Sequence, residues 1–235
     1  MKQTKSAAAI YQYGSTLTLF GMVINGDLTS NKMLEHGNYG LGLENNIKSE
    51  FIVVNNEIYT IDAVGKVDKA TPNSKASYMT MWDFKPEKTV TLKNIKSYKE
   101  LDTALKAEME SENSFYTYKM KGQFSFLEMG SAIEYKNNET LIENRERRVL
   151  YTNHDVSGIM VGHFTPNHAA ATCFPGMHFH FISDDLKLGG HLEDIAFDQI
   201  DVEIQKVDTL VFTLPEVEAI KVADMNSAFL PPAVP

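Results

Sequence analysis

The sequence predicts an α+β protein with a mixed sheet, in which helices lie in the N-terminal part and the C-terminal part is mostly antiparallel β. Apolar residues at helical spacing occur within the first 113 residues, whereas the later chain alternates apolar and polar positions. No internal repeat and no linker rich in Pro, Gly or Ser divides the chain. With 235 residues, 43% of them hydrophobic, the chain has ample material for a core and is expected to fold alone.

Two short helices are expected near the N-terminus. Residues 15–24 carry apolar side chains at the spacing of one helical face. A second short helix is expected after the N-cap candidates Thr29 and Ser30, with Gly37 as its stop signal.

Strands should follow these helices. Residues 49–67 are typical of a β-hairpin, because a β-branched run, an Asn-Asn turn at positions 55 and 56, and an alternating return strand succeed one another. Further strands are expected at 75–84 and 88–95.

The clearest helix of the sequence is expected at 97–113. Ser97 and Glu100 have the spacing of a capping box, and Leu101 and Leu105 share one apolar face with Met109.

The second half should be mostly β. Strand-like patterns occupy residues 114–129, 156–166 and 195–215, and the polar segment 134–155 is the expected surface excursion. This segment also contains the expected joint between an N-terminal α/β subdomain, residues 1–145, and a β-rich metal-binding subdomain, residues 146–235, which together form one functional unit.

Charge and cysteine content narrow the function. A net charge of −9 argues against a nucleic-acid groove or an anionic membrane surface, since both need clustered Lys and Arg, so the expected ligand is a small molecule. A single cysteine, Cys173, excludes an internal disulfide framework and a thiolate-rich zinc site. Because no run of 18 apolar residues occurs, no transmembrane helix is expected. The chain is expected to be cytoplasmic, although a secreted protein whose signal peptide was removed would look the same.

Three of the seven histidines lie close together in the sequence, at positions 178, 180 and 191. In a strand, His178 and His180 project to the same face, and the turn residues 183–190 would return the chain as an antiparallel neighbour carrying His191. Three converging imidazoles without an evident fourth protein ligand are typical of a catalytic metal site that keeps one position open. The alternative is that they are ordinary strand histidines with hydrogen-bond partners.

The segments around these histidines resemble the signature of the alpha-acetolactate decarboxylase family. The signature residues are "GIMVGHFTP", which ends at Pro166, and "PGMHFHFISDDLKLGGHLEDI", which starts at Pro175. Residues 11–42, 112–124 and 202–205 are also similar to that family, in the same order. The resemblance implies a two-part α/β fold, a homodimer, a Zn²⁺ ion held by the three histidines, and the conversion of 2-acetolactate to acetoin and CO2.

The resemblance also identifies Glu50 with the family's first catalytic glutamate, although an exposed acid opening a strand would give the same sequence pattern. Two family features are missing. Gly130 stands where the family has a catalytic arginine, and no acid follows Asp224 where the family has a second glutamate. The arginines at 145, 147 and 148 lie in a charged run that is typical of solvated surface. Without a replacement cation, activity on acetolactate should be lower by about 10²-fold or more, and Gly130→Arg should raise it.

Three functions are therefore compatible with the sequence. They are acetolactate decarboxylation, a related metal-assisted decarboxylation or isomerisation of another hydroxy-keto acid, and non-catalytic zinc or ligand binding on the same fold. The roles of two further residues also have alternatives. His163 could be a nearby donor or a packing residue, and Glu193, two residues past His191, could be a metal ligand, a replacement acid or an exposed strand end.

Overall fold

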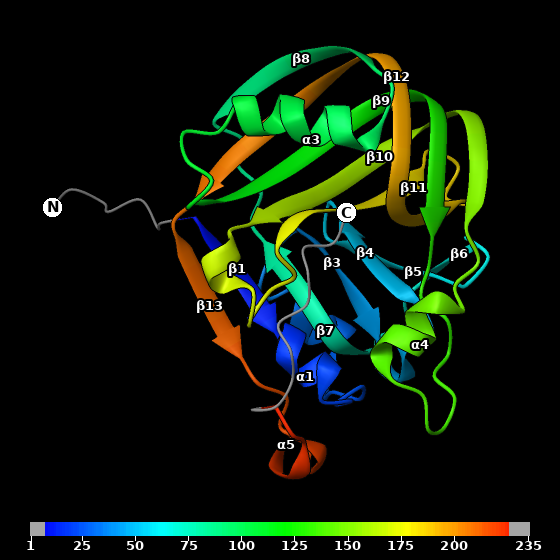
Figure 1. Ribbon diagram of the computed structural model, residues 1–235, viewed down its shortest axis with the longest axis vertical. Coiled ribbons are helices and arrows are strands. Elements are labelled where there is room, and N and C mark those ends of the chain that lie inside the picture. Colours follow the sequence, from blue (N-terminus) through cyan, green and yellow to red (C-terminus); the bar gives the residue numbers. More distant parts are fainter. Residues whose placement is uncertain (1–7, 226–235) are drawn as a thin grey trace, which may run out of the picture.

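Two β-sheets organise the protein in the computed structural model, which describes residues 8–225 (Figure 1). The first sheet has the strand order β13-β1-β7-β3-β4-β5-β6, and β2 pairs with β7. Its strands are β1 (Ala9–Tyr13), β2 (Leu28–Thr29), β3 (Tyr39–Glu44), β4 (Glu50–Val54), β5 (Glu57–Ile61), β6 (Val67–Lys69), β7 (Lys75–Trp82) and β13 (Thr209–Thr213). The β1–β13 pair is parallel and the other pairs are antiparallel, so this sheet is mixed, as expected.

The second sheet is antiparallel and has the order β11-β10-β9-β12-β8. Its strands are β8 (Lys88–Ile95), β9 (Phe115–Gly130), β10 (Tyr151–Thr165), β11 (Gly176–Ser183) and β12 (Gly189–Val207). The start of β12 also pairs with β11. His191 therefore lies between two partners, opposite His180 on β11 and opposite Gly130 on β9.

The helices are short and lie outside the sheets. They are α1 (Thr16–Phe20), α2 (Ser30–Met33), α3 (Tyr98–Ala107), α4 (Leu141–Glu146) and α5 (Ala219–Val222), with 3-10 turns at Asn45–Ile47 and Asn167–Ala169. Figure 1 shows α3 lying across β8, β9 and β12, and α4 beside the ends of β4 and β5. No helix within residues 8–225 combines the length and apolar character that crossing a bilayer requires.

The core has two main layers. One apolar cluster joins α3 to the second sheet and contains Leu101, Leu105, Phe124 and Phe197. The other draws Ile52 and Trp82 from the first sheet and Val161 and Ile182 from the second. Because this second cluster contains side chains from both sheets, the two sheets pack face to face, and β4 comes to lie against β11.

The expected local structure is largely confirmed. Asn55 and Asn56 both have positive φ, 52° and 65°, which is the backbone that a two-residue hairpin between β4 and β5 requires. Ser97 caps α3 by accepting a hydrogen bond from the Glu100 N–H, although the helix ends at Ala107 rather than at 113.

The division of the chain at 145/146 into subdomains stays a prediction. Sheet membership changes at other places, since β8 and β9 belong to the second sheet and β13 returns to the first.

The polar segment 134–155 lies at the surface, as expected, since Asn144 is its one buried residue. It also contains α4, whose capping box joins Thr140 and Glu143 and whose residues cover a cavity. Arg147 pairs with Glu139 at 2.7 Å, and Asn144 donates to the Ile133 carbonyl oxygen. These contacts satisfy polar groups within the protein, so this charged surface segment is ordered and forms one wall of the cavity.

Candidate metal centre and active site

The strand β11 places His178 and His180 on one face. Their neighbours Met177, Phe179 and Phe181 point to the other face and are buried in the core beneath α3. This burial fixes the strand, because a shift of one residue would exchange the aromatic side chains with the imidazoles.

The turn after β11 returns His191 to the same place. The Ser183 hydroxyl donates to Asp185 at 2.7 Å and accepts from the Leu188 N–H at 3.0 Å, which closes the turn. His191 then lies directly opposite His180 on the antiparallel partner, so the expected strand geometry is confirmed. One ligand nitrogen from each of the three histidines lies within 4.8 Å of the others. Their role as metal ligands stays a prediction.

The hydrogen bonds of His180 fix its tautomer. Its Nδ1 donates to the Phe51 carbonyl oxygen at 2.8 Å, because a carbonyl oxygen can only accept. The other ring nitrogen, Nε2, is fully buried and lies 3.0 Å from the Oε2 atom of Glu50. Glu50 opens β4 and is 5% exposed, so it is not the exposed acid that its sequence position allowed.

This arrangement fits a bound cation. An unprotonated Nε2 and an ionised carboxylate are both acceptors, and they repel at this distance unless a proton or a cation lies between them. A proton on His180 would satisfy that one contact only. The Nδ1 atom of His178 is also buried without a hydrogen-bond partner, and a cation bound among the three histidines would satisfy both atoms.

The surroundings keep the imidazoles of His178 and His191 neutral. Burial lowers the pKa of His178 and of His191 well below the usual value, and the neighbouring histidines lower both further. Neutral imidazole is the form that binds a metal, so the pair stays competent at neutral and mildly acidic pH.

His163 lies beside the histidine group, its ring centroid 5.4 Å from that of His178, and its role stays a prediction. It lies on β10 directly opposite His178, is fully buried, and its Nδ1 lies 3.2 Å from the Thr165 hydroxyl. Burial lowers the pKa of His163 to about 3. It does not line the cavity described below.

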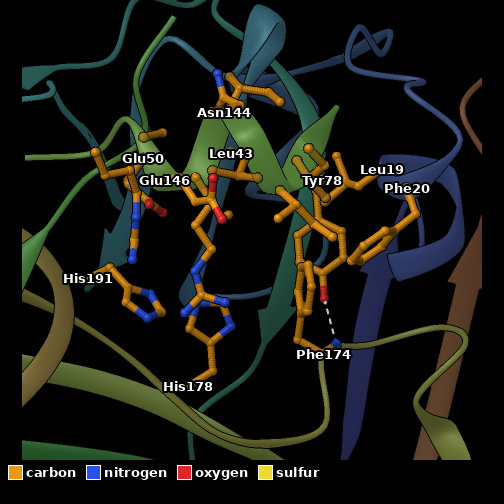
Figure 2. Close-up of a pocket in the computed structure, with 17 residues that line it drawn as sticks. Leu19, Phe20, Leu43, Glu50, Tyr78, Asn144, Glu146, Phe174, His178 and His191 are labelled. Carbon is orange, nitrogen blue, oxygen red and sulfur yellow. Dashed lines mark hydrogen bonds between the residues drawn. The ribbon is translucent and has the colours of Figure 1, made fainter. Parts of the chain in front are cut away.

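A cavity of about 510 Å³ opens over the histidines. Figure 2 shows Glu50, His178 and His191 at one end of it, and Leu19, Phe20, Tyr78 and Phe174 at the other. The Tyr78 hydroxyl accepts a hydrogen bond from the Phe174 N–H at 3.2 Å, which fixes this apolar wall. The lining also includes Gly42, Leu43, Ile47, Ala132, Leu141, Ile142, Asn144, Arg145, Glu146 and Arg148. A polar end and an apolar end suit a small polar molecule that carries an alkyl group.

The charged run 145–148 is not simply solvated surface, as its sequence suggested. Arg145 is exposed but lines the cavity, and Arg147 pairs with Glu139. The side chain of Arg148 is only 13% exposed and pairs with Glu193 at 2.6 Å. The physical reason is that folding brings an acid into contact with each guanidinium group. Glu139, eight residues earlier, pairs with Arg147, and Glu193, 45 residues later, pairs with Arg148.

Glu193 is neither an exposed strand end nor one of the grouped metal ligands. Its side chain is 14% exposed, its Oε1 accepts from Arg148, and the same oxygen lies 4.0 Å from the His191 Nε2 atom. A register shift of β12 between Leu192 and Asp194 places this side chain beside the arginine.

Gly130 lies close to Arg148. A Cβ atom built there would lie 3.0 Å from Leu150 and 3.6 Å from the Nη1 atom of Arg148. The guanidinium of Arg148 therefore lies next to the position where the family arginine was expected, opposite His191. Sequence reasoning missed Arg148 and Arg145 as cavity residues. The capping pattern of Thr140 and Glu143 was a detectable signal for the helix that carries Arg145 and ends two residues before Arg148.

The C-terminal residues 226–235, where the family glutamate was sought, lie outside the described residues.

Comparison with known proteins points to one family. The family model for alpha-acetolactate decarboxylase matches residues 10–227. The alpha-acetolactate decarboxylase of Brevibacillus brevis is 29% identical over 218 residues, covering 92% of this chain and 76% of that protein. That of Streptococcus thermophilus is 30% identical over 207 residues and 87% of each chain.

Solved structures agree on the fold. A crystal structure of alpha-acetolactate decarboxylase from Bacillus subtilis superposes with a TM-score of 0.89 at 22% identity, covering 93% of this chain and 94% of that one. A Staphylococcus aureus protein of unknown function, described as similar to alpha-acetolactate decarboxylase, gives 0.87 at 28% identity and covers 94% and 96%. The family model, these relatives and the shared α+β fold place the chain in the alpha-acetolactate decarboxylase family of carboxy-lyases.

Proposed function

We propose that this protein catalyses the metal-dependent decarboxylation of 2-acetolactate to acetoin and CO2. One observation carries the proposal: Nε2 of His180 and the Glu50 carboxylate face each other at 3.0 Å, next to His178 and His191, at the polar end of the cavity. The names of the relatives support the same substrate.

The metal is proposed to be zinc, held by His178, His180 and His191. Neutral imidazoles are ligands that Zn²⁺ prefers, and a site with three protein ligands leaves a position for substrate. When bound there, the ion would act as a Lewis acid that stabilises the negative charge left by loss of CO2. The hydrogen bond from His180 to the Phe51 carbonyl oxygen orients that ligand before any metal arrives.

Glu50 is proposed to handle the proton. When the bond to the carboxylate carbon breaks, its electron pair passes into the adjacent carbonyl group, and the product needs one proton on carbon to become acetoin. Glu50 is buried beside the histidines and lines the cavity, so its carboxyl group can deliver that proton and regain one afterwards. The net reaction consumes one proton for each CO2 released.

A second substrate is favoured by the apolar end of the cavity. Acetolactate carries only methyl groups, whereas Leu19, Phe20 and Phe174 form a wall that could cover a longer alkyl chain. A hydroxy-keto acid with a larger 2-alkyl group would place that group against this wall. Comparing acetolactate with its 2-ethyl and 2-propyl homologues at equal metal content tests this alternative.

Two further expectations remain predictions. The homodimer would be tested by sedimentation at several protein concentrations, and the cytoplasmic location by fractionating cells that express the protein.

The deciding experiment measures acetoin. The zinc-loaded protein is incubated with racemic acetolactate, and acetoin formation is compared with the spontaneous rate and with Glu50→Gln at equal zinc content. We expect formation well above the spontaneous rate, reduced by about 10²–10⁴-fold in Glu50→Gln because one positioned proton carrier is lost. Acetoin formation at the spontaneous rate would refute the proposal and favour a binding function.

A further inference from the structure

Two arginines from one segment line the cavity, and their charges act on the histidines at its polar end. Arg145 lies in the last turn of α4 and Arg148 follows three residues later, and both line the cavity together with Glu50, His178 and His191. No other arginine or lysine of the described chain lines it. Apart from a bound metal ion, these two arginines are therefore the cations of the described chain that can balance an anionic group of a ligand in the cavity.

The two arginines are not equivalent. Arg148 is enclosed and already paired, since its Nη2 donates to Glu193 at 2.6 Å and both side chains are mostly buried. Arg145 has no hydrogen bond or ion pair from its side chain to another residue within 8–225, and it is exposed toward the cavity. Its guanidinium is thus free to form hydrogen bonds with a ligand, although the charges of Glu193 and Glu50 act on it, whereas the guanidinium of Arg148 is already paired.

Arg148 lies beside Gly130, the residue of β9 that is opposite His191. The Nη1 and Cζ atoms of Arg148 lie 3.6 and 3.7 Å from the point where a Cβ of residue 130 would stand, so a side chain longer than that of alanine would have to share this space. In this position Arg148 keeps Glu193 paired. The charge of Glu193 acts on Arg145, and an unpaired Glu193 would compete with a ligand for that arginine.

We propose that Arg145 binds the carboxylate of the substrate, and that Arg148 is a positioning residue that keeps Glu193 away from it. In this protein the cation that binds the substrate carboxylate is therefore an arginine of α4 and not a residue at the end of β9. A planar guanidinium can pair with a carboxylate through two parallel hydrogen bonds, which both binds and orients it. This inference rests on the proposed function, because it assumes a carboxylate substrate over the histidines.

The other charges of the cavity are consistent with this assignment. Glu50 lies 3.0 Å from Nε2 of His180, at the proposed metal site, and is not a hydrogen-bonding partner of Arg145. Glu146 also lines the cavity but is exposed to solvent, which weakens its repulsion of a bound anion.

The test uses two ligands that cannot decarboxylate. The first, 2,3-dihydroxy-2-methylbutanoate, keeps the 2-hydroxyl and the carboxylate of acetolactate and has a hydroxyl in place of the ketone; the second, 2,3-butanediol, has the same two hydroxyl groups and lacks the carboxylate. Calorimetric titration of the zinc-loaded full chain gives the ratio of the two affinities, which isolates the contribution of the carboxylate.

In Arg145→Gln, we expect the affinity for the acid to fall by about 10–100-fold, the usual scale for a hydrogen-bonded ion pair, while the diol affinity and zinc content stay unchanged. Arg145→Lys should recover part of the loss. Lys48→Gln is the matched control, since Lys48 is exposed, pairs with Glu44 and does not line the cavity. It removes the same charge and should leave the ratio unchanged.

The positioning role has its own test. Arg148→Gln alone should weaken binding of the acid, because Glu193 is released, and the double variant Arg148→Gln/Glu193→Gln should restore it. Equal binding of the acid by wild type and Arg145→Gln, or loss in Arg148→Gln that the double variant does not rescue, would overturn the assignment. If wild type forms no acetoin but Arg145 still selects the acid, the proposed function fails and this inference stands.

Discussion

The close approach of β10 and β11 gives a prediction that links packing to the metal centre. Gly162 on β10 lies opposite Phe179 on β11, between the positions of His178 and His180. A Cβ added there would lie 2.6 Å from Cε1 of Phe179, and closer still to its Cδ1 and to the carbonyl oxygen of His178. A side chain can rotate away from such a contact, but the backbone carbonyl cannot. In Gly162→Ala the two strands must therefore separate by about 1 Å, since well-packed interiors hold no spare space.

The size of the effect follows from this geometry. Overpacking a core usually costs about 1–3 kcal/mol, and we expect Gly162→Ala to lie near 3 kcal/mol because backbone atoms are involved. The displaced strand carries both His178 and His180 away from His191, so zinc affinity should also fall by about 10-fold or more. Guanidinium denaturation of the metal-free protein measures the stability, and competition with a chromophoric chelator measures the zinc affinity.

Gly122→Ala is the matched control. Its Cβ would meet only side-chain atoms of Ile200, at 3.1 Å and beyond, and this side chain can shift. We expect its unfolding free energy to change by less than about 1 kcal/mol, because restricting the unfolded chain offsets the small contact strain. If Gly162→Ala proves as stable as Gly122→Ala and binds zinc equally well, the argument from the backbone contact is wrong.

The remaining predictions concern the metal and the position of the arginine that binds the substrate carboxylate. A His178→Ala, His180→Ala double variant should contain almost no zinc by elemental analysis, because one imidazole binds far more weakly than three, and full metal content would rule out the site. Zinc at 100-fold excess over its dissociation constant should raise the unfolding free energy of wild type by about 2.7 kcal/mol in urea titrations, and should not stabilise that variant. Gly130→Arg should not raise acetoin formation, because Leu150 and Arg148 already occupy the direction of its side chain. A faster Gly130→Arg enzyme would show that α4 does not replace an arginine at 130.

Turns, helix caps and the spacing of the histidines were predictable because they depend on residues that are close together in the sequence. The Asn55-Asn56 turn and the Ser97 cap depend on residues a few positions apart, and the structure contains both. The same holds for His178 and His180, since alternation along a strand places them on one face, and for His191, which a short turn returns beside them.

Contacts between distant segments were decided only by the tertiary structure. The sequence allowed Glu50 to be an exposed acid, but packing of the two sheets buries it 3.0 Å from His180. No local pattern could reveal this distance, because 130 residues separate the two side chains and the pairing of the sheets sets it.

The same reason explains why the sequence predicted solvated surface for the arginines of residues 145–148. A run of arginines has the composition of solvated surface, and composition contains no information about a partner 45 residues away. The partner of Arg148 is Glu193, and its guanidinium lies next to Gly130, which is 18 residues away in sequence. The sequence by itself determined the histidine group and the family's fold, through local periodicity and motif order. The tertiary structure alone decided which charges meet in the cavity, because electrostatic pairing depends on distance in space.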